Sequence, residues 1–398
     1  MFPALKIKNF RLYWLGMFIS LIGTWIQAVA QSWLVFQLTN SAILLGVVGF
    51  LSYIPVFLLS LFAGVVADRM NKRTILIFTQ VAFMLLALTL GILTQTKLIT
   101  PLGIMLIAVL NGIVMSFDAP TRQAVVVELV GKEHLLNAIV LNSAAFSSSR
   151  IIGPALAGIF IAGIGMSGCF YINAVSFLAV IVALSLIKID NGARKKNKTV
   201  LLKDLMQGLR FIKDNRTIVI LVTMVGITSL FGISYVILMP IFANVILKVG
   251  AKGLGTLMSA VGIGALLAAL ILARLGNFRY KGRYLILSSL IFSLSLTLFS
   301  LSRVYLFSLI TLAIVGWASV TAISLINTIL QTLVPDEFRG RVMSVFMFTF
   351  AGLMPFGNLI AGGLAELFGV SWAVFTGGII CSIFFLSINT LYPGIRDL

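Results

Sequence analysis

The chain has 398 residues, of which 60% are hydrophobic and 10% charged, and its formal net charge is +18. A soluble protein carries about 25% charged residues because its outer surface must be hydrated, so this composition excludes a water-soluble fold. It also excludes the nucleic-acid partner that the basic charge would otherwise suggest. The apolar residues fall instead into runs of about 20, the length that a helix needs to cross a bilayer. We therefore expect a protein that crosses the lipid bilayer many times.

The apolar runs predict an all-α polytopic membrane protein with twelve transmembrane helices. These helices are expected near residues 12–38, 42–67, 74–96, 102–121, 137–164, 168–187, 217–247, 254–274, 284–302, 304–331, 341–365 and 371–392. The longest polar interval, 188–216, is predicted to be a cytoplasmic linker between an N-terminal six-helix bundle (1–187) and a C-terminal one (217–398). Within this linker, residues 200–213 place leucines at helical spacing and predict an amphipathic helix on the membrane surface.

Basic residues predict the orientation. Most of the 29 Lys and Arg residues fall in the connections that lie on the same side as both chain ends. The few basic residues in connections on the opposite side are Lys97, Lys248, Lys252 and Arg303. Because cytoplasmic segments of membrane proteins are enriched in Lys and Arg, both termini are predicted to be cytoplasmic, in the inner membrane of a cell. We call this side inner and the opposite side outer.

The two predicted bundles resemble each other in sequence. At an offset of 209, LGVVGFLSYIP from Leu45 aligns with LGTLMSAVGIG from Leu254. At an offset of 204, GPALAG from Gly153 aligns with GNLIAG from Gly357. Internal duplication of this kind is typical of transporters, in which the substrate path runs between the repeats. The bundles are therefore expected to be pseudo-symmetric.

The sharpest motif joins the second and third predicted helices and reads GVVADRMNKR from Gly64 to Arg73. Gly64 permits another helix to approach closely, and Asp68 can accept hydrogen bonds from the free amides at a helix start. The segment resembles the signature GxxxD(R/K)xGR(R/K) of the major facilitator superfamily. Asn71 replaces a glycine of that signature, and both residue types tolerate a left-handed turn. The alternative is a basic loop that only obeys the orientation rule.

This resemblance implies the major facilitator fold and a gate on the cytoplasmic side. In the family, the motif aspartate docks against the start of helix 11, and the basic residues of the motif stay at the lipid headgroups. The predicted gating residues are Gly64, Asp68, Arg69, Lys72, Arg73, Arg339 and Arg341.

A second motif, RIIGPALAG from Arg150, lies in the fifth predicted helix. Pro154 removes a helix hydrogen bond and bends the axis, while Gly153 and Gly158 permit close helix contact. The segment resembles the antiporter motif of the same superfamily, centred on GPxxGG, with Ala157 in place of a glycine. That resemblance implies export, whereas the alternative is a helix-packing seam; both can hold. Most of the chain resembles the drug and siderophore efflux branch that contains enterobactin exporters and macrolide efflux pumps.

Few charges fall inside the predicted helices. A charge in mid-membrane is costly and usually faces a cavity or a partner, so Arg150 is expected to pair with Asp118, close to Arg122. Whether Arg150 braces two helices or faces substrate stays open. The family's helix-4 motif has Arg where this chain has Ala108. Asp118 and Glu366, at the inner and outer edges, are the acids that remain. Asp118 is therefore the first candidate carrier if protons are the coupling ion.

Polar side chains inside the apolar runs predict a cavity lining. The many Phe and Met side chains would suit a cavity for large apolar molecules, although in a membrane protein such residues more often face lipid or pack against other helices. The predicted lining residues are Thr24, Gln27, Gln31, Asn111, Asn142, Asn173 and Tyr235. No catalytic residue, metal site or cofactor is expected, because the chain has one His and two Cys and its few acids do not cluster.

The sequence thus predicts a monomeric secondary active exporter that carries amphipathic small molecules, such as a drug, a macrolide or a siderophore, by alternating access with proton antiport. The alternatives are a lipid or lysophospholipid flippase of the same fold and a membrane sensor that transports nothing. A membrane enzyme is disfavoured by the scarcity of catalytic residue types.

Overall fold

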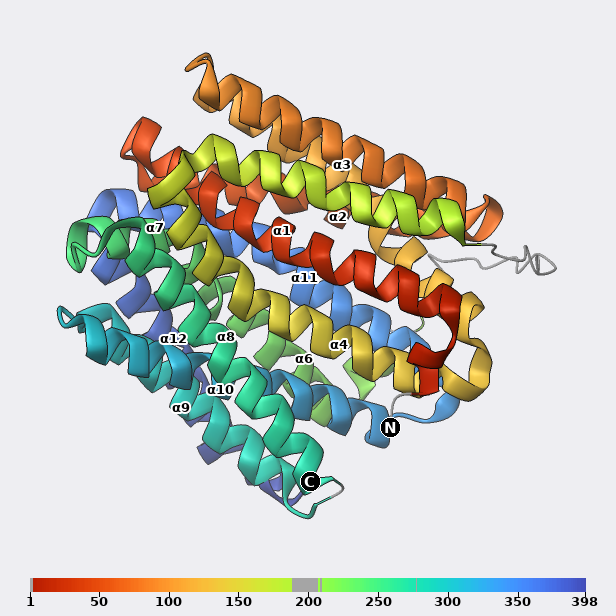
Figure 1. Cartoon of the computed structure of the whole chain (residues 1–398). Helices are drawn as coiled ribbons and strands as arrows, with labels where there is room; N and C mark the ends of the chain where they lie inside the picture. The colour runs from red at the N-terminus through yellow and green to blue at the C-terminus, as the bar shows by residue number, and fades with distance from the viewer. Residues whose placement is uncertain (1–2, 188–206, 208–209, 277) are drawn as a thin grey trace. The chain divides into compact units, whose positions relative to one another are not determined.

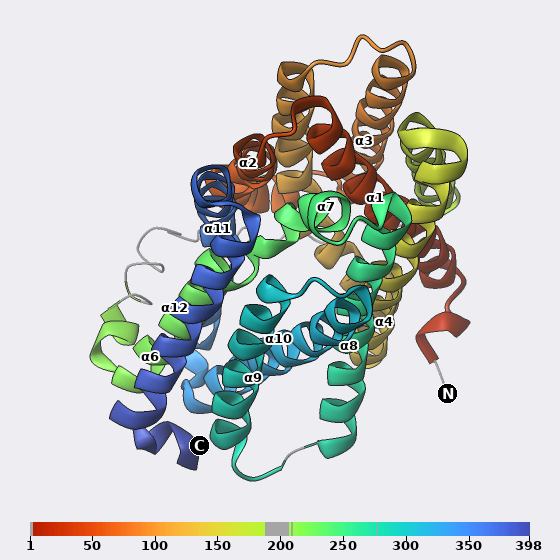
Figure 2. The same ribbon diagram turned by 90° about the vertical axis from the view of Figure 1, so that its left-hand side faces the viewer.

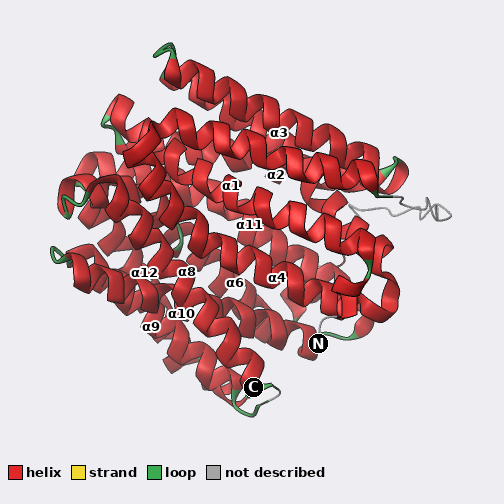
Figure 3. Cartoon of the chain, in the orientation of Figure 1, coloured by secondary structure: helices red, strands yellow, loops and turns green. Residues whose placement is uncertain are grey.

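The computed structural model describes residues 3–187, 207, 210–276 and 278–398. These residues form helices joined by short loops and contain no strand (Figure 3). The helices labelled in Figure 1 are α1 (Lys8–Thr39), α2 (Ala42–Arg69), α3 (Lys72–Gln95), α4 (Pro101–Leu186), α6 (Arg216–Ile227), α7 (Met239–Ile241), α8 (Gly250–Leu275), α9 (Lys281–Leu301), α10 (Tyr305–Leu333), α11 (Asp336–Phe368) and α12 (Val370–Leu391). The predicted amphipathic helix at 200–213 lies for the most part outside the described residues.

The described chain contains 11 helices that are long and apolar enough to cross a membrane. One of them, Glu133–Leu186, has 54 residues, about twice the length that one crossing needs. It is broken at Gly165, whose φ of 76° favours glycine, and a similar break at Gly131 (φ 67°) precedes it. α4 therefore consists of three membrane-spanning segments, 101–131, 133–164 and 165–186. With these breaks the described residues supply twelve crossings, and the predicted all-α polytopic fold is confirmed.

The first segment of α4 is longer than the sequence predicts. The predicted end is at 121, but the helix continues to Gly131 although Pro120 lies inside it. Val125 and Val126 of this extension are buried and belong to a cluster that includes α1 residues. Packing of this apolar face extends the helix past the polar residues that signal an end.

The seventh crossing, Arg216–Ile246, is not the continuous helix predicted from its apolar run. After α6 it passes through a π turn at Thr228–Gly232, a 3₁₀ turn at Ser234–Leu238, α7 and a second π turn at Phe242–Ile246. Pro240 has no N–H to donate to the preceding turn. At Gly232 an added Cβ would lie 2.7 Å from the ring of Phe292 in α9, so the packing there requires glycine. Both residues lie within the irregular stretch and disfavour a regular α-helix there.

Close contacts divide the described residues into two compact units. Unit 1 lies within Met1–Asn40, Leu51–Asn197 and Gly250–Ser259, and unit 2 within Ser41–Phe50, Lys198–Val249 and Ala260–Leu398. Each unit thus contains the first turns of one helix from the other half of the sequence. The start of α2 belongs to unit 2, and the start of α8 belongs to unit 1.

In unit 2 the start of α2 packs backbone to backbone against α11. A Cβ at Gly46 would lie 2.7 Å from the carbonyl oxygen of Asn358 and 3.0 Å from the Cα of Gly362. A Cβ at Gly362 would lie 2.8 Å from the carbonyl oxygen of Ala42. Side chains do not fit at such distances, so both positions require glycine. We call this contact, made by Ala42, Gly46, Asn358 and Gly362, the α2–α11 junction.

In unit 1 the start of α8 packs in the same way against the second segment of α4. A Cβ at Gly158 would lie 2.9 Å from the carbonyl oxygen of Ala251. A Cβ at Gly255 would lie 3.0 Å from the Cα of Gly158 and would also meet the carbonyl oxygen of Pro154. We call this contact, made by Ala251, Gly255, Pro154 and Gly158, the α8–α4 junction.

The two junctions are copies of each other. The sequence offset of 209 carries the α2 residues of one junction onto the α8 residues of the other, and the offset of 204 carries the α4 residues onto the α11 residues. The internal repeat seen in the sequence is therefore repeated contact by contact in the structure.

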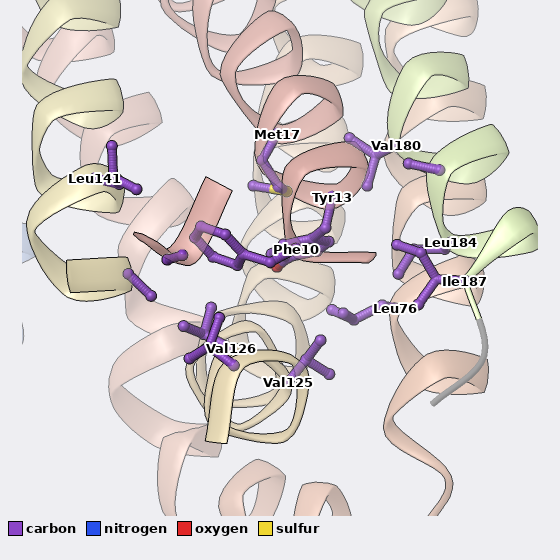
Figure 4. Packing of buried hydrophobic residues seen from close by; sticks show 14 residues of the cluster. Phe10, Tyr13, Met17, Leu76, Val125, Val126, Leu141, Val180, Leu184 and Ile187 are labelled. Atoms are coloured by element: carbon purple, nitrogen blue, oxygen red, sulfur yellow. The ribbon is translucent and has the colours of Figure 1, made fainter. Parts of the chain in front are cut away.

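A buried apolar cluster fastens α1 to α3 and α4 in unit 1. Phe10, Tyr13 and Met17 of α1 belong to this cluster together with Val126 of α4 and Leu76 of α3 (Figure 4). In unit 2, α9 and α10 lie side by side (Figure 2). α9 carries a row of buried serines whose hydroxyls donate to its own carbonyls, and such small side chains let helices approach closely in a membrane.

The junction geometry predicts opposite outcomes for two neighbouring glycines of α11. Gly362→Val would place a branched side chain against the backbone of α2, whereas a Cβ at Gly363 meets nothing within 4 Å. Gly362→Val should destabilise the protein by about 1–3 kcal/mol, as overpacking does, and should therefore lower its melting temperature in detergent. Gly363→Val is the matched control and should melt close to the parent protein. Equal melting of the two variants would contradict the close contact.

Candidate functional site

The loop between α2 and α3 carries the facilitator-like motif. The side chains of Asp68 and Arg69 lie outside the described residues, so their docking stays a prediction. Asn71 accepts hydrogen bonds on its side-chain oxygen from the amides of Arg73 (3.0 Å) and Thr74 (3.3 Å). Its φ of −67° is not left-handed. Asn71, which stands at the glycine position of the signature, is therefore the N-cap of α3 and does not use the left-handed turn that it would tolerate.

Lys72 and Arg73, which were expected at the headgroups, bind groups of unit 1. Lys72 forms an ion pair with Glu128 in the first segment of α4. Arg73 donates from Nε to the carbonyl oxygen of Leu184 and from Nη2 to that of Ser185, both at 2.7 Å. A cation at the last carbonyls of a helix is stabilising. The basic residues of the motif thus tie the α2–α3 loop to two segments of α4.

The start of α11, the predicted partner of the motif aspartate, lies in unit 2. Arg339 pairs with Asp336 in the first turn, with 2.6 Å between Nη2 and Oδ1, and Arg341 lies over the ring of Phe338. Phe338 stacks on Phe211 with ring centroids 4.4 Å apart. Among the described residues, no side chain caps the first amides of α11. These amides are the groups that the prediction assigns to the motif aspartate.

Among the described acids of unit 1, Asp118 makes the most side-chain contacts. It is buried, and its Oδ1 accepts hydrogen bonds from Thr79 Oγ1 (2.8 Å) and Gln80 Nε2 (2.7 Å). Its Oδ2 forms an ion pair with Arg122, one turn later on the same helix. The expected pairing of Asp118 with Arg150 is therefore wrong, because Arg122 occupies the carboxylate.

Arg150 forms no ion pair with any residue that the structure describes. It lies about 25 Å from the start of a segment about 46 Å long, and its side chain is half-buried. Its guanidinium lies 6.0 Å from the ring centroid of Trp25 in α1, and Trp25 in turn meets Phe146 edge to face. A cation and two aromatic rings thus come together in unit 1.

The glycines of the second motif lie at close contacts, unlike the glycine of the first. A Cβ at Gly153 would collide with the Cβ of Trp25, and Gly158 forms the α8–α4 junction. Around Gly64, by contrast, an added Cβ meets no heavy atom of the described residues within 4 Å. The close approach expected at Gly64 is absent from this conformation, whereas the second motif packs tightly on both sides.

The predicted lining residues fall into two groups in the structure, those that are buried against other helices and those that stay accessible. Asn173 donates from Nδ2 to Gln27 Oε1 at 2.7 Å, and both side chains are buried. Tyr235 is buried against Phe299. These three residues brace helices in this conformation. Those that stay half-buried or exposed, and so remain predicted lining residues, are Thr24, Gln31, Asn111 and Asn142.

Glu366, which the sequence marked only as an acid near the outer edge, makes a contact that was not predicted. Its carboxylate caps the start of α2, through Ser41 and the amides of Ala42 and Ile43. A serine immediately before a helix was the available signal. The sequence could not show that the acid bound to this serine is Glu366, because the two residues are 325 positions apart. Among the described residues, no group of three His, Cys, Asp or Glu side chains gathers as metal ligands.

The sequence model of one family, described as transmembrane secretion effector (MFS_3), matches residues 1–392. The chain belongs to this family. It is a major facilitator superfamily transporter and not an enzyme, which confirms the resemblance drawn from the motifs.

Curated relatives cover most of the chain. The staphyloferrin A transporter of Staphylococcus aureus is 28% identical over 89% of this chain and 88% of its own length. The multidrug efflux pump Tap of Mycolicibacterium fortuitum is 26% identical, with 87% of each chain covered. The enterobactin exporter EntS of Shigella boydii is 24% identical over 90% of this chain and 85% of its own.

Solved structures share the fold at low identity. A bacterial homologue of the lysosomal transporter Spinster, in an inward-facing conformation, superposes with a TM-score of 0.75 at 12% identity over 100% of this chain and 99% of the other. The nucleoside transporter NupG superposes with a TM-score of 0.74 at 14% identity over 98% and 99%. The facilitator transporter described here is thus a multi-pass membrane protein of known fold, related in sequence to transporters of organic molecules.

The bonding of Asp118 predicts an effect on stability. Asp118→Ala leaves Arg122 without its carboxylate and should destabilise the protein by about 3 kcal/mol, the usual cost of breaking a buried ion pair. Glu128→Gln breaks the more exposed pair with Lys72 and should cost about 1 kcal/mol or less. Thermal unfolding of the purified variants in one detergent gives the comparison. Equal shifts in the two variants would contradict the assigned burial of the Asp118 pair.

Proposed function

We propose that this transporter is a secondary active exporter that moves amphipathic organic molecules from the cytoplasm to the outside by alternating access. The direction is supported by the RIIGPALAG motif and by relatives whose names describe an efflux pump and an exporter. The Lys and Arg distribution supports cytoplasmic ends in the cytoplasmic membrane.

The observation that carries the choice of substrate is the environment of Arg150. A mid-membrane cation without an acid partner is costly unless it faces a cavity or a ligand. The nearby ring of Trp25 can stack on an unsaturated or aromatic group, and the guanidinium can bind a carboxylate through two parallel hydrogen bonds. The substrate class that matches both groups is an anionic amphipathic molecule, as a carboxylate siderophore would be. Arg150 is thus proposed to face substrate rather than to brace two helices.

Asp118 is proposed as the proton carrier of the antiport. Its carboxylate accepts hydrogen bonds from Thr79 and Gln80 and pairs with Arg122. A proton on Asp118 removes the charge that Arg122 pairs with, so protonation would release Arg122. The Asp118–Arg122 pair would thus break when Asp118 binds a proton and form again when the proton leaves. These two states would give the N-terminal bundle two arrangements, and substrate transport could be coupled to the change between them.

Uptake into inverted vesicles tests the proposal. With an inside-acid gradient, the vesicles should accumulate a citrate-based siderophore faster than a cationic dye of equal size. Equal accumulation with and without the gradient would remove the antiport. Accumulation of labelled lysophospholipid alone would favour a flippase, and no accumulation of any of the three would favour a sensor.

Arg150→Gln should raise the KM for the anionic substrate about tenfold or more, because a charge-assisted hydrogen bond contributes about 1.5–3 kcal/mol. The rate for a neutral analogue of the substrate should stay within about twofold, since no charge is recognised there. Equal losses for the charged and neutral compounds, together with a lower melting temperature, would assign Arg150 to bracing instead.

Asp68→Asn should reduce transport to background while expression stays near normal, because the amide cannot supply the charge that docks at a helix start. Glu133→Gln, an acid-to-amide change at an exposed position of α4, is the control and should transport like the parent. Unchanged flux in Asp68→Asn would refute the gate.

A further inference from the structure

One oxygen of Glu366 accepts three hydrogen bonds from the start of α2. Oε2 lies 2.7 Å from the amide nitrogen of Ala42, 3.1 Å from that of Ile43 and 3.0 Å from the hydroxyl of Ser41. The first amides of a helix have no partner within the helix and carry partial positive charge. A carboxylate that accepts from two such amides and a hydroxyl is a charge-assisted cap, stronger than a neutral one.

This cap lies one turn from the glycine contact at Gly362, so Glu366 and the α2–α11 junction act on the same short stretch of α2. That stretch, within Ser41–Phe50, packs in unit 2, whereas the rest of α2 belongs to unit 1. The cap therefore fixes the first turns of a helix whose remaining length is part of the other compact unit. Any motion that separates α2 from α11 at this end must break it.

The repeated junction has no such cap. At the offsets that relate the junctions, Glu366 corresponds to Ala162 and Ser41 to Gly250. The start of α8 has no side-chain cap among the described residues. The two junctions share their glycine contacts, but the carboxylate is present at the α2–α11 junction alone. Packing of the repeats therefore does not require Glu366.

A buried amide opposes the packing at the α2–α11 junction. The side chain of Asn358 is 1% exposed, and neither its Nδ2 nor its Oδ1 has a hydrogen-bond partner among the described residues. It lies against the α2 stretch, where a Cβ at Gly49 would meet Nδ2 at 3.0 Å. An unsatisfied buried amide destabilises this packing and gains partners when water reaches it. The junction thus combines a group that favours opening with a cap that favours closure.

We propose that Glu366 is a latch of the outer mouth: its carboxylate holds the start of α2 against α11 while the outer side is closed and lets go when that side opens. This inference rests on the alternating access of the proposed function. It assigns to Glu366 a positioning role, since the residue acts on α2 and not on the substrate.

The latch has the same chemistry as the predicted inner gate, at the opposite ends of the same two helices. Asp68, near the end of α2, is predicted to cap the start of α11, and Glu366, near the end of α11, caps the start of α2. A closed outer mouth uses one cap and a closed inner mouth the other. The two helices would then exchange one helix cap for another in each transport cycle.

Thiol labelling tests the latch without any substrate. The natural cysteines, Cys169 and Cys381, are buried, so Leu45→Cys adds a single reporter one turn inside the cap, at a side chain that is 4% exposed. In sealed cells, an impermeant maleimide should label this thiol about fivefold faster when Glu366→Ala is added, because a lost helix cap changes an equilibrium by about that factor. Glu366→Gln, which keeps an acceptor oxygen without the charge, should give an intermediate rate.

Glu133→Gln in the same background is the control and should leave the labelling rate unchanged. Labelling of the Leu45→Cys thiol that does not respond to either Glu366 variant would overturn the latch. A parallel rise in labelling of Cys169 and Cys381 would also overturn it, because the cap would then only stabilise the fold. If the rate rises as expected while vesicles accumulate no compound, the latch stands and the exporter proposal fails.

Discussion

Backbone contact at glycine is the constraint on which the other features of this transporter depend. In each compact unit the first turns of one helix lie against a partner helix so closely that carbonyl oxygens occupy the space of a side chain. Between helices in a membrane, where lipid tails are as apolar as leucine, such van der Waals contact and polar bonding replace the hydrophobic effect as the source of association. A gap of about 0.5–1 Å already removes roughly a quarter to a half of this attraction, so partly separated arrangements of the two backbones are disfavoured.

The two junctions are equivalent in their packing and different in their polar groups. The α2–α11 junction adds the Glu366 cap and the unsatisfied Asn358 amide, while the α8–α4 junction has proline at the position of Asn358. A similar asymmetry holds for the buried charges. Asp118 and Arg122 pair in unit 1, and their counterparts in the second half at the offset of 204 are Ala322 and Ile326. Duplication thus accounts for the scaffold, and the polar residues added to one copy account for the proposed coupling.

Much of the fold could be read from the sequence, because a bilayer requires apolar helices of a fixed length and so leaves few alternatives. The irregular seventh crossing was missed, since Gly232 and Pro240 interrupt the helix without interrupting its hydropathy. For the site, the motifs identified the family, but the partners of their residues were partly wrong. Asp118 was expected to pair with Arg150, whereas the residue one helical turn away reaches it first. Gln27 and Asn173 are predicted lining residues, and the hydrogen bond that joins them could not be read from the sequence.

The sequence alone determined the class of protein, the number of crossings, the internal duplication and the family, because each of these follows from local composition or from residue spacing. Tertiary structure alone decided which polar side chains bond to one another, which glycines touch a neighbouring backbone, and which acid caps the start of α2. Those contacts join residues far apart in the chain, such as Ser41 and Glu366, and their formation depends on the rotation and depth of packed helices. Hydropathy fixes neither rotation nor depth, because every face of a buried or lipid-facing helix is equally apolar.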